Sequence, residues 1–325
     1  MKNLQSLLFL FFGLSANAQS YPPQAGTEGS TAIFKDSPVY VAWATGITVE
    51  RGLVNKSNPS AMASGSNKAS FGLPSDAIGP PTGPVVSLGD EGFAIATFAQ
   101  PIYDGEGYDL AVFENGGATF LELAFVEVSS DGINFFRFPA HSETQTDTQI
   151  GSFGTPSATY LNNLAGKYAG QYGTPFDLSE IEDNVLLDKD QITHVKIVDV
   201  VGSIDPLYAT YDSFGNAVNE SFPTPFNSCG FDLQAVGVIN QGTLNRDDFV
   251  KNNIKMYPNP ASDYFTIKSD EEMKVTLYDV SGRMVLDKNI QPNERIATSD
   301  LRAGVYIVQV LSAQGKKTAQ RLVIK

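Results

Sequence analysis

The densest group of oxygen ligands in the sequence lies between residues 104 and 114. Asp104, Glu106 and Asp109 are interleaved with glycines, and Glu114 follows shortly after. Calcium takes six to eight oxygen ligands from carboxylates, amide oxygens and backbone carbonyls. The spacing does not fit an EF-hand loop, so we predict an irregular calcium site formed by Asp104, Glu106, Asp109 and Glu114. A solvated acidic turn is the alternative interpretation.

A second group of residues combines aromatic rings with carboxylates in the long segment 202–230. Loops longer than about 12–15 residues are usually functional or disordered, and this one is too aromatic for disorder. A sugar ring needs an apolar face to stack on and acceptors for its hydroxyls. We therefore predict that Tyr208, Tyr211, Asp212 and Phe214 bind a glycan or another small ligand. A loop packed by its own side chains is the alternative that the sequence leaves open.

The sequence offers little support for catalysis. It contains no Gly-x-Ser-x-Gly elbow, no His-Glu-x-x-His helix and no phosphate-binding loop. His141, His194 and Cys229 are isolated from residues that commonly activate them. Glu122 and Glu127 lie an odd number of positions apart, so on one strand they face opposite sides. We predict a protein that is not an enzyme, with a polysaccharide hydrolase as a lesser alternative.

The charge and the cysteine count exclude or disfavour further classes of partner and site. The 325 residues include 36 acidic and 22 basic ones, a net charge of −14, which disfavours nucleic acid as a partner. A single cysteine excludes an internal disulfide and a thiolate metal cluster. The chain is long enough for about two domains. Residues 255–325 carry 11 basic and 8 acidic residues, whereas the rest carries 11 basic and 28 acidic residues, which indicates two different units.

The residues that precede 240 must position both candidate sites, and their pattern is that of strands and turns. One short helix is expected at 179–187. About eight strands with long loops predict an all-β fold, a jelly-roll-like β-sandwich over residues 19–240. The expected strands are 39–44, 85–88, 93–98, 110–113, 121–129, 134–138, 193–201 and 232–239.

One hairpin in this region carries a resemblance. The string VEVSSDGINFFRFP, residues 126–139, resembles the hairpin of discoidin-type, galactose-binding-like domains, and the strands at 193–200 and 232–239 keep the order of that family. Residues 74–83 lie where such domains carry an Ala-x-Asp-Gly ion loop, but Gly-Pro-Pro replaces Asp-Gly, so that ion site is not transferred. The same region is also similar to bacterial surface proteins of unknown function.

The last 71 residues alternate short strands with Gly and Asn turns, which predicts a small Ig-like antiparallel β-sandwich. MYPNPASDYF at 256–265, LYDVSGRMV at 277–285, LRAGVYIVQV at 301–310 and a terminal lysine resemble a type A sorting domain of the type IX secretion system. The resemblance implies a Bacteroidetes bacterium, export by the type IX machinery and removal of the domain by its sortase. The sorting signal it implies comprises Tyr257, Pro258, Asn259, Pro260, Gly282, Arg283, Gly304, Tyr306 and Lys325.

The first residues have the pattern of a secretory signal peptide. Lys2 precedes a short apolar run at 7–14, and Ala16-Asn17-Ala18 supplies a cleavage site, so we predict a signal peptide over residues 1–18. The run is well short of the roughly 20 residues that span a bilayer, and we expect no transmembrane segment in the mature chain. A polar linker is expected at 241–254, followed by the sorting domain at 255–325.

Together these patterns predict a secreted or outer-membrane surface protein whose body is a calcium-stabilised module for a glycan or small ligand. Three alternatives stay open from the sequence. They are a structural or adhesive surface protein without a small-molecule site, an accessory that passes nutrients to an outer-membrane transporter, and the polysaccharide hydrolase named above.

Overall fold

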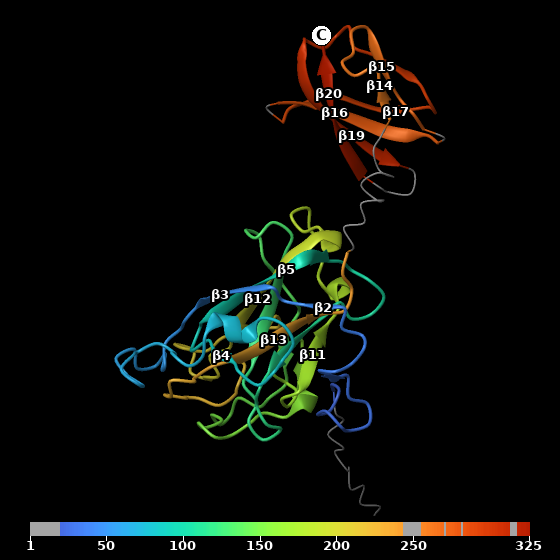
Figure 1. Ribbon diagram of the computed structural model, residues 1–325. Helices are drawn as coiled ribbons and strands as arrows, with labels where there is room; N and C mark the ends of the chain where they lie inside the picture. Colours follow the sequence, from blue (N-terminus) through green and yellow to red (C-terminus); the bar gives the residue numbers. More distant parts are fainter. Residues whose placement is uncertain (1–19, 243–254, 270, 281, 313–316) are drawn as a thin grey trace, which may run out of the picture. The chain divides into compact units, whose positions relative to one another are not determined.

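Figure 1 shows the computed structural model, which describes residues 20–242, 255–269, 271–280, 282–312 and 317–325. The expected signal peptide and residues 243–254 of the expected linker lie outside these ranges. The described residues divide into two compact units, 20–242 and 255–325, which we call the body and the tail. Both units are built from strands, so the prediction of an all-β fold is confirmed.

The body contains two antiparallel sheets (Figure 1). One has, in order, β1 (Ile33–Phe34), β11 (Tyr172–Phe176), β6 (Leu110–Glu114), β13 (Asp232–Val238) and β2 (Ala42–Trp43), with β4 (Val86–Ser87) also paired to β13. The other has β3 (Gly46–Glu50), β5 (Phe93–Ile102), β12 (Ile192–Asp199), β7 (Ala124–Ser129) and β8 (Phe136–Arg137). A separate pair is formed by β9 (His141–Ser142) and β10 (Leu161–Asn162).

The order of these strands is that of a jelly roll. Successive strands β4, β5, β6 and β7 alternate between the two sheets, and β11, β12 and β13 do so again. The result is β4-β13-β6-β11 in one layer and β5-β12-β7-β8 in the other, as expected for two interleaved Greek keys. The sequence prediction of a jelly-roll sandwich is therefore confirmed.

A large apolar cluster fills the space between the two sheets. Leu110 and Val112 alternate along β6, while Val195 and Ile197 alternate along β12, and all four are fully or almost fully buried in this cluster. Since side chains alternate across a strand, both strands turn one face inward. Trp43 instead packs with Tyr40 and Phe113 in a smaller cluster that is separate from the large one.

The described residues contain no α-helix, only four short 3-10 turns: η1 (Pro74–Ala77), η2 (Ala158–Tyr160), η3 (Leu178–Glu180) and η4 (Lys189–Gln191). The helix predicted at 179–187 is therefore wrong. Asp177 accepts a hydrogen bond from the amide of Ser179, and Asn184 accepts one from the amide of Leu186. Such local side-chain bonds compete with the helical ladder, so the chain makes separate turns there.

The tail is a second antiparallel sandwich, as predicted for an Ig-like unit. Its core joins side chains of both sheets, among them Phe265, Leu277, Ile296 and Val308. One sheet has β14 (Met256–Tyr257), β15 (Tyr264–Ile267) and β18 (Arg295–Ala297); the other has β17 (Met284–Ile290), β16 (Met273–Asp279), β19 (Gly304–Ser312) and β20 (Lys317–Ile324).

We expect Phe176→Ala to destabilise the body by about 3–5 kcal/mol, because Phe176 is fully buried and packs on Phe138 with ring centroids 4.9 Å apart. Urea unfolding followed by fluorescence checks this, since Trp43 is the single tryptophan and reports on the body alone. Phe34→Ala is the control; Phe34 is 39% exposed, and its loss should cost less than about 1 kcal/mol. Equal losses for the two variants would contradict the assigned core.

Candidate functional site

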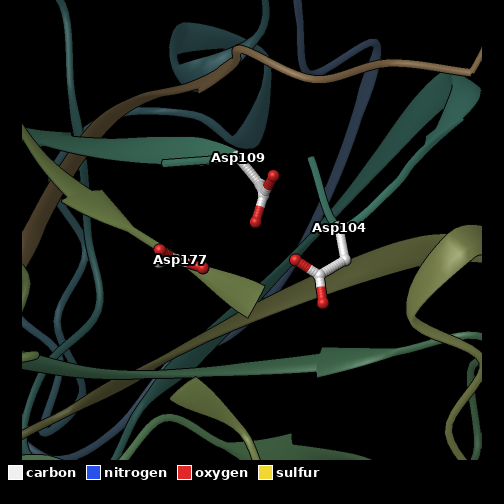
Figure 2. Close-up of side chains that lie close together, drawn as sticks. All are labelled: Asp104, Asp109 and Asp177. Carbon is white, nitrogen blue, oxygen red and sulfur yellow. The ribbon is translucent and has the colours of Figure 1, made fainter. Parts of the chain in front are cut away.

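Three carboxylates meet beside one end of strand β6, and we call them the acidic triad. Asp109 directly precedes β6 and Asp177 directly follows β11; the two strands pair so that Leu110 lies opposite Phe176. The register therefore places these two aspartates side by side, and Asp104 approaches from the β5–β6 loop (Figure 2). Carboxylate oxygens of the three lie within 4.8 Å of one another.

Protein donors already hold two members of the triad. Asp109 accepts hydrogen bonds from the Gly105 amide and the Asn240 side chain, both 2.8 Å, and from the Leu178 amide at 2.7 Å. Asp177 accepts from the amide and hydroxyl of Ser179. These bonds fix the carboxylates in place, while oxygen lone pairs stay available for a cation.

Among the described residues, no cation forms an ion pair with the triad. Burial raises the pKa of Asp109, and its hydrogen bonds oppose that rise. Burial also raises the pKa of Asp104, with Lys189 acting against it. The Lys189 ammonium pairs with Asp183 at 3.0 Å instead. Hard carboxylate oxygens at this spacing are what calcium binds, so the triad is chemically suited to that ion.

The structure thus brings together half of the predicted metal ligands. Asp104 and Asp109 are neighbours, but Glu106 is exposed to solvent in the loop. Glu114 ends β6 and so lies about 16 Å along the strand from Asp109. Asp177, which the sequence analysis missed, takes the third position. No local sequence pattern indicated Asp177, because only the pairing of β11 with β6 brings it to the triad.

The aromatic segment contributes to a different feature, a hollow of about 440 Å³ on the surface of the body. We call it the polar hollow. One side comes from β9 and the residues that follow it, and the other from a tight hairpin closed between Tyr211 and Ala217. The lining residues are His141, Ser142, Glu143, Thr144, Gln145, Thr146, Gly215, Asn216 and Ala217.

An aromatic pair borders the polar hollow. Phe214 is 67% exposed and stacks on His141 with ring centroids 4.4 Å apart. The Nδ1 atom of His141 hydrogen-bonds with the hydroxyl of Tyr21, which fixes the imidazole. Thr144 is almost completely buried, and its hydroxyl oxygen has no hydrogen-bond partner among the described residues. The exposed ring of Phe214 therefore lies next to the polar groups of the hollow.

Asp212 organises this hairpin rather than presenting free acceptors. Its carboxylate accepts hydrogen bonds from the amides of Ser142, Phe214 and Asn216 and from the Asn216 side chain. Although burial acts in the opposite direction, these bonds hold the pKa of Asp212 below its usual range. Asp212 thus ties the hairpin to β9 and positions both sides of the hollow.

The other predicted ligand-binding residues are distributed around this hairpin. Tyr211 is 46% exposed at its base, and Tyr208 is half-buried; neither of them lines the hollow. His141, Gln145 and Asn216 were missed by the sequence analysis. They belong to segments that meet only in the folded chain, so no spacing pattern could indicate them.

Six further carboxylates are buried at one end of the body, and we call them the buried acidic cluster. All are between 1% and 7% exposed. Burial raises the pKa of each, and repulsion between neighbouring carboxylates adds to the effect at Glu122 and Glu220. Cys229 is fully buried beside them, and its thiol pKa is raised in the same way. The members are Asp90, Glu114, Glu122, Asp199, Glu220 and Asp232.

In the tail, several predicted sorting residues hold the fold together. Asn259 accepts from the Val323 amide and donates to the Arg321 carbonyl, so it fastens the turn after β14 to β20. The Tyr306 hydroxyl donates to the Arg302 carbonyl. Tyr257 lies in β14 with an exposed side chain, and the peptide bonds before Pro258 and Pro260 are cis.

The remaining sorting residues lie at turns and strand ends. Gly282 has a φ of +80°, which a side chain would disfavour. Arg283 pairs with Asp279 at 3.1 Å across the same turn. Gly304 begins β19, and the amide of Lys325 donates to the Ala261 carbonyl.

A family comparison identifies the tail. Residues 255–325 match the family described as "Secretion system C-terminal sorting domain", so this part of the chain is a type IX sorting domain, as the motifs predicted. The domain directs the protein to the type IX secretion machinery and to a secreted or cell-surface location. Within the described ranges, no helix has the length and hydropathy needed to cross a membrane.

Two curated relatives match short stretches of the chain. Beta-agarase D of Zobellia galactanivorans is 30% identical over 71 residues, which are 22% of this chain and 15% of the relative. An endo-acting ulvan lyase of Formosa agariphila is 26% identical over 87 residues, 26% of this chain and 17% of the relative. The matched part thus spans less than one fifth of either relative.

Solved structures give only distant overlaps. A Ruminococcus gnavus beta-glucuronidase is 11% identical over 72% of this chain and 35% of that chain, with a TM-score of 0.18. The same enzyme in complex with an N1-substituted uronic isofagomine overlaps 94% of this chain and 48% of its own, with a TM-score of 0.20. Overlaps at this level do not define a shared fold.

The buried acidic cluster makes body stability depend on pH. Asp90 and Asp232 have pKa values of about 6 in the fold against 3.8 ordinarily, so the folded state keeps protons that the unfolded chain has lost. We expect the free energy of unfolding, measured in EDTA, to fall as pH rises from about 4 through 6, on the order of 2 kcal/mol for each group. Trp43 fluorescence in urea measures it; stability that rises over this interval would contradict the prediction.

Proposed function

We propose that the exported body is a calcium-stabilised module that binds a glycan or a similar polyhydroxylated small molecule. The observation that carries the proposal is the pair formed by Phe214 and His141 beside the polar hollow. An exposed aromatic face next to polar groups suits the two surfaces of a sugar ring. Binding pockets commonly combine apolar contacts with a few positioned polar groups.

The lining of the hollow supports recognition of hydroxyl groups. Glu143, Gln145, Thr146 and Asn216 supply carboxylate, amide and hydroxyl functions along its walls. These groups both donate and accept hydrogen bonds. The buried Thr144 hydroxyl adds a polar group that still lacks a protein partner. Neutral or weakly charged sugars fit this lining better than nucleotides, because the described residues that form it include no Lys or Arg.

We propose binding without catalysis. Glycoside hydrolysis uses two carboxyl groups that flank the scissile bond, and Glu143 is the one carboxylate among the described residues that line the hollow. The two curated relatives are named as polysaccharide-degrading enzymes, but the matched part is a small share of each. Their activities therefore do not transfer to this chain.

Calcium at the acidic triad belongs to the same proposal as a stabilising ion. The triad joins the β5–β6 loop, the start of β6 and the end of β11, and Asn240 contacts it from the end of the body. A calcium ion there would offset two of the three negative charges and link these segments. Export by the tail delivers the module to surroundings outside the cell, where calcium and glycans are available.

Phe214→Ala should weaken sugar binding about tenfold, because loss of the stacking face removes roughly 1–1.5 kcal/mol. A panel of mono- and oligosaccharides is titrated against the full chain by calorimetry. Phe153→Ala is the matched control, since Phe153 is 78% exposed but packs against Phe226, whereas Phe214 packs against His141, which lines the hollow. Equal effects of the two substitutions, or no binding of any sugar to the wild-type chain, would count against the polar hollow as a glycan site.

Calcium should raise the melting temperature of the body, and Asp104→Asn should reduce the rise. A ligand at one hundred times its dissociation constant stabilises by about 2.7 kcal/mol, or roughly 5 °C for a unit of this size. Thermal unfolding in millimolar calcium and in EDTA gives the measurement. Glu106→Gln is the control, because Glu106 lies two residues away and outside the triad. An unchanged rise in Asp104→Asn would remove the triad from the proposal.

A further inference from the structure

The buried acidic cluster lies at one end of the sandwich, as strand register requires. Glu114, the last residue of β6, pairs with Leu233 near the start of β13. Asp199, the last residue of β12, pairs with Ala124 at the start of β7. Because Glu114 continues the inward series of Leu110 and Val112 on its strand, its carboxylate faces the space between the two sheets.

Asp199 reaches the same space from the opposite sheet. It continues the inward series of Val195 and Ile197 on β12. Its carboxylate accepts hydrogen bonds from the amides of Phe231 at 2.7 Å and Glu91 at 3.1 Å. The two sheets thus each direct a carboxylate into the end of the core.

Backbone amides satisfy some of these carboxylates but not all of them. Glu220 accepts from the Leu123 amide at 2.7 Å, and Asp90 accepts from the Lys56 amide at 2.6 Å. Glu114 is 1% exposed, and its Oε1 atom is buried without any hydrogen-bond partner among the described residues. A buried carboxylate oxygen in this state is costly unless a cation or another donor meets it.

Protein cations do not fill that role. Among the described residues, no member of the buried acidic cluster forms an ion pair within 4.0 Å. The half-buried Arg51 guanidinium, which acts electrostatically on Asp232, donates its hydrogen bonds to the carbonyls of Phe71, Gly72 and Ser87. Six buried carboxylates therefore share one end of the body with too little positive charge.

We propose that Glu114 and Glu122 bind a calcium ion at this end of the body, separate from the acidic triad. The Glu122 carboxylate, 6% exposed, makes no hydrogen bond to the described residues, so both of its oxygens are available. Glu114 supplies the unpartnered Oε1. The two glutamates come from opposite ends of the β6–β7 connection, which would close around the ion.

A backbone carbonyl oxygen and Glu114 both lie beside Gly116. An added Cβ at Gly116 would lie 2.4 Å from the Phe120 carbonyl oxygen and 2.6 Å from Oε2 of Glu114. Glycine at this position thus lets a carbonyl and a carboxylate pack against the same backbone atom. Calcium accepts such mixed shells of carboxylate, carbonyl and water.

The cluster is less tightly gathered than the acidic triad. In the part of the chain that the structure describes, Asp104, Asp109 and Asp177 form the one group that brings three acidic or imidazole ligand atoms within 4.8 Å. The proposed site is therefore held by two carboxylates, with carbonyl and water oxygens completing the shell. Glu220 and Asp199 lie behind it and add negative charge.

The test measures bound calcium in the full chain after removal of metal with EDTA and re-addition of calcium. The starting variant is Asp104→Asn, which disables the triad so that the second site is seen alone. We expect this variant to keep one bound calcium ion per chain and a calcium-induced rise in melting temperature. Adding Glu122→Gln should abolish both, whereas adding Glu127→Gln should leave both unchanged.

Glu127 is a matched control because its carboxylate is on neighbouring strand β7 but pairs with Arg137 and Lys196. Glu122→Gln also removes a like charge, so we expect it to melt no lower than its parent in EDTA. Glu114→Gln is the second variant should Glu122→Gln fold poorly.

Two outcomes would overturn the proposal: Asp104→Asn chains that bind no calcium, or calcium binding that survives both glutamine substitutions. Calcium binding that is lost with Glu122→Gln alone but unaffected by Asp104→Asn would support this site and reject the triad. The two calcium proposals therefore fail separately.

Discussion

Strand β6 is buried along its whole length, and a carboxylate stands at each of its ends. The stability of the body depends on which donors or cations meet these two buried carboxyl groups. At the first end, three protein donors hold Asp109. At the other end, one oxygen of Glu114 has a protein donor, and the second has none among the described residues. A central strand can place such groups only where neighbouring loops supply donors or where cations enter.

One long loop contacts both the buried acidic cluster and the polar hollow. The segment from 202 to 230 closes one end through Glu220, whose carboxylate binds the Leu123 amide, and reaches the polar hollow through Asp212. One connection therefore serves both a charged layer inside the body and a hollow on its surface. The buried acidic cluster and the polar hollow are thus linked through a single stretch of chain.

Local pattern was sufficient to predict most of the fold. The apolar runs predicted β12 and β13, and about eight strands with long loops predicted the jelly-roll sandwich. The tail was predicted from four ordered motifs. Residues in these motifs, such as Asn259 and Tyr306, make specific hydrogen bonds that few other side chains make. The helix prediction failed at 179–187, because Asp and Asn side chains there form local hydrogen bonds that compete with a helix.

The sites were harder to predict, because their residues meet through strand register rather than through spacing. Asp104 and Asp109 were predicted, but Asp177 reaches them only because β11 pairs with β6. Asp212 was expected to face a ligand and instead has its oxygens occupied by backbone amides. Burial of Glu114 and Glu122 gave no sequence signal, because acidic residues in a strand pattern are ordinarily taken as solvent-facing.

The buried thiol of Cys229 has a consequence for the export of this protein. Oxidation and disulfide exchange proceed through the thiolate, and burial next to carboxylates keeps this sulfur protonated and out of reach. With no second cysteine in the chain, the protein can mature in an oxidising compartment without a disulfide isomerase. In the folded body this sulfur is therefore unreactive toward other thiols.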